Sequence, residues 1–121
     1  MSAVSGSLVI VPENAAVTSN TGASVRFTCR TNSGGAIQWT LRDLDIRNPI
    51  RIVYNGGSIT TDFRTRFSVT PSGDGQYDLV IANVQNVDPG TYMCTEISGG
   101  DTAAAILTVI GKVTIDITLK Q

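Results

Sequence analysis

The chain has 121 residues, which suits one domain and is too short for two full ones. Its 9 basic and 10 acidic residues nearly balance, so charge gives no reason to expect nucleic acid or an anionic membrane as a partner. The absence of histidine excludes the usual Ser-His-Asp and Cys-His forms of catalysis. We therefore expect a protein that is not an enzyme and holds no cofactor or metal ion.

Short stretches of alternating apolar and polar residues, separated by turn sequences, predict about nine β-strands. The first strand, residues 7–11, must break or change partner at Pro12, which cannot donate a backbone hydrogen bond, and residues 15–19 resume it. Further strands are predicted at residues 24–30, 37–42, 50–54, 58–61, 67–70, 76–82, 91–96 and 103–110. This pattern favours a sandwich or a barrel.

The two cysteines, Cys29 and Cys94, each lie in an apolar, strand-like stretch. With no other cysteine and no histidine in the chain, a zinc site of ordinary spacing is excluded. Two alternatives remain at this point: two separate buried thiols, or a disulfide. A disulfide closing so long a loop would stabilise the fold by about 4 kcal/mol and would imply an oxidising compartment.

The residues around the cysteines form a recognisable set. Trp39 follows Cys29 on the next predicted strand. Tyr92 precedes Cys94 by two residues, so Tyr92 and Cys94 point to the same face of their strand. The stretch Asp88 to Cys94 reads D-P-G-T-Y-M-C and resembles the D-x-G/A-x-Y-x-C motif of immunoglobulin domains. The long spacing between the cysteines leaves room for two extra strands and resembles the variable set of that superfamily.

The resemblance implies an all-β, two-sheet Greek-key immunoglobulin sandwich of the variable set (V-set) over residues 7–110. The structural residues that it implies are a Cys29–Cys94 disulfide, the core residues Trp39, Leu79 and Tyr92, and an ion pair between Arg66 and Asp88. In that family the tyrosine hydroxyl bonds back to the upstream backbone.

Two departures from the family pattern narrow the class of receptor. Arg42 stands where antigen-receptor domains usually carry a glutamine that pairs with its twin, and two arginines would repel each other there. The joining-segment signature, an aromatic residue followed by G-x-G, is absent at residues 102–105. The sequence therefore resembles a non-rearranging immune-type or adhesion receptor.

The candidate interface is the outward face of one predicted sheet, the front sheet. Its expected members are Gln38, Thr40, Arg42, Ile52, Tyr54, Met93 and Thr95. Ile52, Tyr54 and Met93 would form an apolar centre within a polar rim, as protein interfaces do. The alternative is that one or two of them face the core, because sequence does not set the register of residues 50–54. The three loops at one end are residues 31–36, 55–60 and 96–102; the last is short and glycine-rich, which favours flat contact.

Two sets of charged residues, one basic and one acidic, each have a functional interpretation and an ordinary one. Arg42, Arg47 and Arg51 would form a positive patch for an acidic ligand, or would be common surface charge. Asp43 and Asp45 would contact a cation, or would lie in a solvated loop.

We expect a binding module of an immune-type receptor ectodomain, extracellular or at the cell surface, that recognises a protein or a glycan. A homodimer through the front sheet is one option; nucleic acid and direct membrane insertion are not expected. The alternative function is a cell-adhesion or structural spacer module that self-associates. Residues 112–120 alternate between apolar and polar side chains, so residues 111–121 are expected to be an extra strand-like tail or a linker to a following domain. The alternative is that this segment pairs with an exposed sheet edge of another copy.

Overall fold

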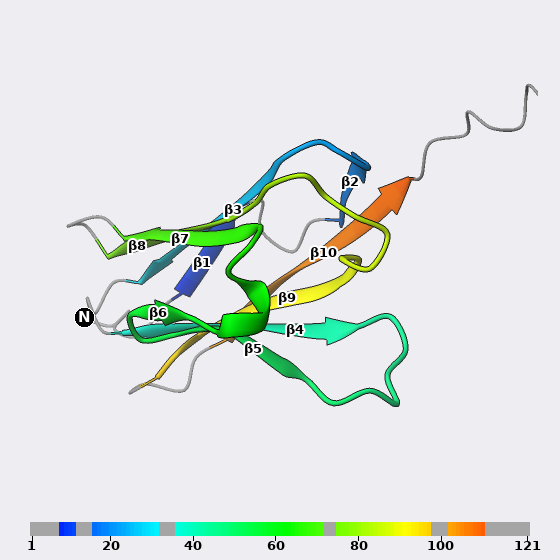
Figure 1. Ribbon diagram of the computed structural model, residues 1–121. Coiled ribbons are helices and arrows are strands. Elements are labelled where there is room, and N and C mark those ends of the chain that lie inside the picture. Colours follow the sequence, from blue (N-terminus) through cyan, green and yellow to red (C-terminus); the bar gives the residue numbers. More distant parts are fainter. Residues whose placement is uncertain (1–7, 12–15, 32–35, 72–74, 98–101, 111–121) are drawn as a thin grey trace, which may run out of the picture.

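The computed structural model describes residues 8–11, 16–31, 36–71, 75–97 and 102–110. Within them, ten strands form two sheets that pack face to face (Figure 1). The expected all-β sandwich is therefore confirmed. The four-stranded sheet, called the back sheet, has the order β1-β3-β8-β7, and the six-stranded front sheet has the order β2-β10-β9-β4-β5-β6.

The strand bounds agree closely with the alternation in the sequence. The back sheet contains β1 (Leu8–Val11), β3 (Val25–Thr31), β8 (Gln76–Ile81) and β7 (Phe67–Pro71). The front sheet contains β2 (Ala16–Asn20), β10 (Thr102–Ile110), β9 (Gly90–Glu96), β4 (Ile37–Asp43), β5 (Arg51–Asn55) and β6 (Ser58–Ile59). The strand predicted over residues 58–61 is shorter, because a 3₁₀ turn, η1 (Thr61–Phe63), follows β6 and buries Phe63.

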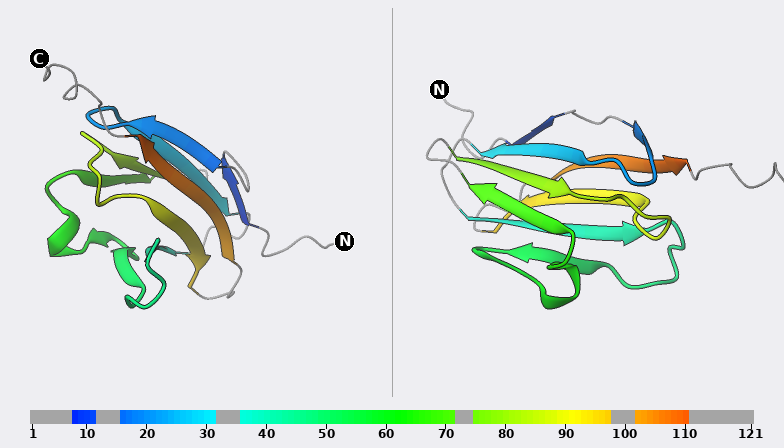
Figure 2. Two further views of the ribbon diagram at one scale, coloured as in Figure 1. Left: turned by 90° about the vertical axis from the view of Figure 1, so that its right-hand side faces the viewer. Right: turned by 45° about the horizontal axis from the view of Figure 1, so that its top comes forward.

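The first predicted strand is divided between the two sheets. β1 pairs antiparallel with β3 in the back sheet, whereas β2 pairs parallel with β10 in the front sheet. The two segments are the separate dark-blue and blue arrows in the right-hand view of Figure 2. The change of partner agrees with the prediction made from Pro12, since proline cannot continue a ladder.

A disulfide between Cys29 of β3 and Cys94 of β9 joins the two sheets, as the sequence predicts. Trp39 of β4 is the cross-strand neighbour of Cys94 and is fully buried. The ring of Phe27 lies 6.4 Å from that of Trp39, and Leu79 closes the same core from the back sheet. Each such side chain contributes about 1.5–3 kcal/mol by burial.

A polar corner closes the sandwich beside this core. The Tyr92 hydroxyl donates to the Asp88 backbone oxygen at 2.6 Å, as the resemblance implies. Arg66 donates twice to the Asp88 carboxylate, at 2.6 and 2.8 Å, and the backbone N–H of Gln85 donates to it at 2.8 Å. Burial raises the pKa of Tyr92 well above its ordinary value, so the phenol remains a neutral donor.

We predict that Asp88→Ala lowers the free energy of unfolding by about 3 kcal/mol, because it leaves Arg66 and the Gln85 N–H without their acceptor in a largely buried site. Chemical denaturation measures this change. The matched control is Asp45→Ala, which removes an exposed carboxylate paired with Arg47 and should leave stability almost unchanged. Equal losses in the two variants would contradict the role given to the corner.

Candidate functional site

The outward face of the front sheet carries a central row of side chains that crosses four strands. Strand pairing aligns Ala104 with Met93, Met93 with Thr40, and Thr40 with Ile52. Directly opposed residues on neighbouring strands have Cβ atoms about 5 Å apart, so these four side chains form one continuous surface. Ile52 is 42% exposed, while Thr40, in the middle, is only 8% exposed because side chains flank it on both sides.

Two further rows flank the central one. The first consists of Thr102, Thr95 and Gln38, and the second of Ile106, Thr91 and Arg42. In the first row the hydroxyls of Thr95 and Thr102 are 3.1 Å apart and share a hydrogen bond. In the second row Ile106 and Arg42 are exposed on either side of Thr91. An apolar strip thus lies beside polar side chains, the anatomy of many protein interfaces.

A β-bulge changes which residues of β5 face outward. The ladder passes from the pair Trp39–Tyr54 to the pair Thr40–Ile52, so Val53 is an extra residue on β5. Because a bulge shifts the alternation by one residue, Val53 and Tyr54 are both buried, and Ile52 faces outward. Ile52 and Tyr54 therefore lie on opposite sides of the sheet.

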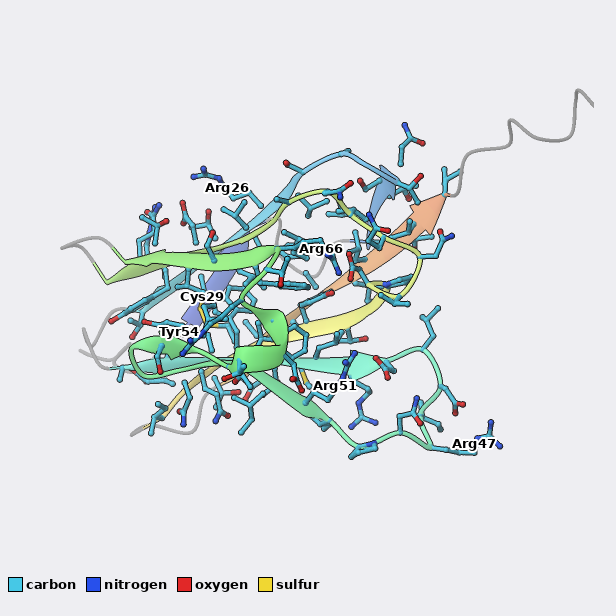
Figure 3. All side chains as sticks on the ribbon, viewed as in Figure 1. Arg26, Cys29, Arg47, Arg51, Tyr54 and Arg66 are labelled. Atoms are coloured by element: carbon cyan, nitrogen blue, oxygen red, sulfur yellow. A yellow bond between two sulfur atoms is a disulfide. The ribbon has the colours of Figure 1, made fainter. Side chains whose placement is uncertain are left out.

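The expectation that Tyr54 belongs to the exposed interface is wrong. Its side chain is 5% exposed and lies between the sheets (Figure 3). The Tyr54 ring is 6.4 Å from that of Tyr77. Burial raises the pKa of Tyr54. Thr40 faces outward as expected but is also largely covered, so it contributes shape to the surface more than accessible area. The structure brings the remaining expected members together: Gln38, Arg42, Ile52, Met93 and Thr95.

The loop between β4 and β5 pairs its charges internally. Arg51 donates to Asp43 at 2.9 Å, and the Arg47 side chain donates twice to the Asp45 carboxylate, at 2.9 and 3.0 Å. The hydrogen bond from Arg47 lowers the pKa of Asp45. Figure 3 shows Arg47 at the outer end of the molecule, pointing away from the sheets. Of the three arginines considered as a positive patch, two are therefore neutralised, and both carboxylates considered for a cation are occupied.

The family model of the immunoglobulin V-set domain matches residues 12–107. The chain belongs to the immunoglobulin V-set family. No curated protein matches it. V-set domains are typically binding modules and not enzymes, and those with a disulfide are usually extracellular. In the part of the chain that the structure describes, no helix is long and apolar enough to cross a membrane.

The three loops predicted at one end of this V-set domain lie partly outside the described residues, which omit 32–35 and 98–101. Where β3 and β9 enter them, Glu96 is fully buried and accepts a hydrogen bond from the Thr31 hydroxyl at 2.7 Å. This bond ties the two sheets together at the base of the loops. Sequence reasoning missed it, although alternation from Tyr92 and Cys94 points Glu96 inward.

An apolar surface at the opposite end of the domain also escaped sequence reasoning. Leu44, Ile46 and Val87 are 70–72% exposed there. Leu44 and Val87 help to line a shallow groove of about 490 Å³ between the β4–β5 loop and the loop before β9. The alternation of Asp43, Leu44, Asp45 and Ile46 was visible in the sequence, but only the fold brings Val87 beside it.

Gly90 permits the close approach of β9 to β4 beneath Arg42. Its φ is +152°, and a Cβ atom at this position would overlap the Arg42 carbonyl oxygen and the Leu41 side chain. Gly57, in the turn between β5 and β6, has nearly the same φ of +149° but no atom within 4 Å of a Cβ built there. Comparing substitutions at the two glycines therefore distinguishes the cost of steric overlap from the cost of backbone strain.

We predict that Gly90→Ala destabilises the V-set domain by about 1–3 kcal/mol more than Gly57→Ala does, because only the first forces β9 away from β4. Thermal and chemical denaturation of the two variants measure the difference. If the two variants lose the same stability, backbone strain alone explains the cost, and the close approach is not a constraint.

Proposed function

We propose that this V-set domain is a binding module of an immune-type receptor ectodomain, and that it recognises a protein ligand through its front face. The front face consists of the outward side chains of β10, β9, β4 and β5. The observation that carries the proposal is the central row of Ala104, Met93, Thr40 and Ile52. This row exposes apolar side chains on a sheet whose strands are already paired with one another. The Cys29–Cys94 disulfide supports an extracellular location.

The regularity of the sheet supports a flat contact. The β9–β4 ladder pairs every residue from Ile37 to Asp43 without a shift, and the β9–β10 ladder is also continuous. The β4–β5 ladder has one register shift, the bulge in β5, and Ile52 beside it faces outward. Such a surface matches another protein surface, whose core is apolar and whose rim is polar.

The distribution of aromatic side chains favours a protein over a glycan. All large apolar side chains exposed in the described part of the chain are aliphatic, among them Ile52 and Ile106 on the front face. The aromatic rings of the described residues are buried or, for Tyr77, partly buried. The front face therefore offers aliphatic contact area and no aromatic platform for a sugar ring.

We also propose the domain boundaries suggested by the sequence. Residues 7–110 form the V-set domain, and residues 111–121 extend its last strand or connect it to a following domain. The second segment lies outside the described residues. A self-associating adhesion or spacer module is the competing function, and the experiment below distinguishes it.

We predict that Met93→Arg lowers the affinity for the ligand at least tenfold, because it places a charge in the central row of the front face. The wild-type domain, assembled as a tetramer, is screened against an array of purified extracellular proteins and an array of glycans. Proteins that bind are tested again with Met93→Arg and with Ser68→Arg. Ser68 is exposed on β7 of the back sheet and provides a matched control for an added arginine.

The expected result is a protein ligand that binds the wild type and Ser68→Arg equally and loses at least tenfold in affinity for Met93→Arg. Binding only to glycans, or loss of binding only in Ser68→Arg, would contradict the proposal. Sedimentation equilibrium of the untagged wild type tests the competing function. A dimer that Met93→Arg dissociates would favour a self-associating module.

A further inference from the structure

Arg42 is the one charged side chain on the front face within the described residues. The other outward side chains of β10, β9, β4 and β5 are neutral: Thr102, Ala104, Ile106, Thr108, Ile110, Thr91, Met93, Thr95, Gln38, Thr40, Ile52 and Asn55. Strand pairing places Arg42 beside Thr91, with Ile106 beyond it, directly next to the central row. Any protein that covers this row also covers or borders the guanidinium group.

Arg42 has no hydrogen bond, ion pair or ring contact among the described residues. The two nearest carboxylates in the sequence are already engaged, Asp43 with Arg51 and Asp45 with Arg47. Two other arginines of the domain, Arg26 and Arg66, are also paired with aspartates. Arg42 therefore differs from its neighbours in having all of its donors free for a partner.

A guanidinium group that loses water at an interface requires an acceptor, since burying an unpaired charge is strongly unfavourable. A carboxylate is the side chain that matches its planar fork with two parallel hydrogen bonds. We propose that the front face binds a protein surface that presents a carboxylate at the edge of an aliphatic patch, and that Arg42 pairs with this carboxylate. This inference rests on the proposed function and names the chemistry of its ligand.

A second copy of the same face does not meet this requirement. The described residues of the front face include no Asp or Glu, so two front faces packed together would bury two arginines without an acceptor. Because neither face carries a carboxylate among these residues, no attraction offsets the repulsion between the two arginines. The ligand is thus a different protein surface, and Arg42 disfavours symmetric pairing of the domain with itself.

The test uses a yeast-displayed library of a small folded scaffold with one randomised flat face as the probe. Clones that bind the wild-type domain and lose binding to Met93→Arg are front-face binders. We expect Asp and Glu to be enriched at their randomised positions, and their affinity to fall at least tenfold for Arg42→Gln and less for Arg42→Lys. Arg30→Gln is the matched control, because Arg30 is exposed on the back sheet and lacks an ion pair.

A double-mutant cycle then replaces the selected carboxylate by its amide in the clone and Arg42 by Gln in the domain. Non-additive losses establish the pair. Front-face clones that lack acidic enrichment and tolerate Arg42→Gln would overturn the carboxylate inference and leave the front-face function standing. Equal losses in Arg30→Gln would also overturn it, by showing attraction to net charge alone. A selection with no clone sensitive to Met93→Arg would instead count against the proposed function.

Discussion

The disulfide between Cys29 and Cys94 is the constraint on which the rest of the domain depends, because it attaches the middle of the front sheet to the back sheet. β9 lies between β10 and β4, and Cys94 is the inward residue at its centre. Side chains alternate along a strand, so fixing Cys94 toward the core also fixes Met93 and Thr95 toward solvent. The same covalent link therefore determines the register of the core and the composition of the front face.

Alternation made much of the fold predictable, and it also predicted the outward direction of every expected interface residue except Tyr54. In β3, β4 and β9 the apolar residues repeat every second position, and the structure keeps that phase from end to end. The prediction failed at Tyr54, because the bulge at Val53 depends on how β5 pairs with β4. Pairing between strands is a long-range property, and the sequence of a single strand does not contain it.

The features that sequence reasoning missed share a second physical cause. The apolar end surface forms because Leu44 and Val87, far apart in the chain, line the same groove between two loops. The burial of Glu96 is tolerated because the Thr31 hydroxyl of the opposite sheet reaches it. A polar residue in a strand usually indicates an exposed position, and only a partner from another element reverses that expectation.

Charge pairing also depends on contacts between elements that are distant in the chain, and it underlies the specificity proposed for the front face. The sequence places Arg42 on the outward face of a strand, but it does not show which of Arg42, Arg47 and Arg51 are paired. The fold pairs Arg47 and Arg51 with aspartates and directs Arg42 to a face whose described residues include no carboxylate. In the proposed interaction, apolar contact at the central row would supply affinity with little selectivity, whereas the unpaired cation beside it would penalise every surface that fails to provide an acceptor. If Arg42 pairs with a carboxylate as proposed, one residue both selects among protein ligands and disfavours a second copy of the same face.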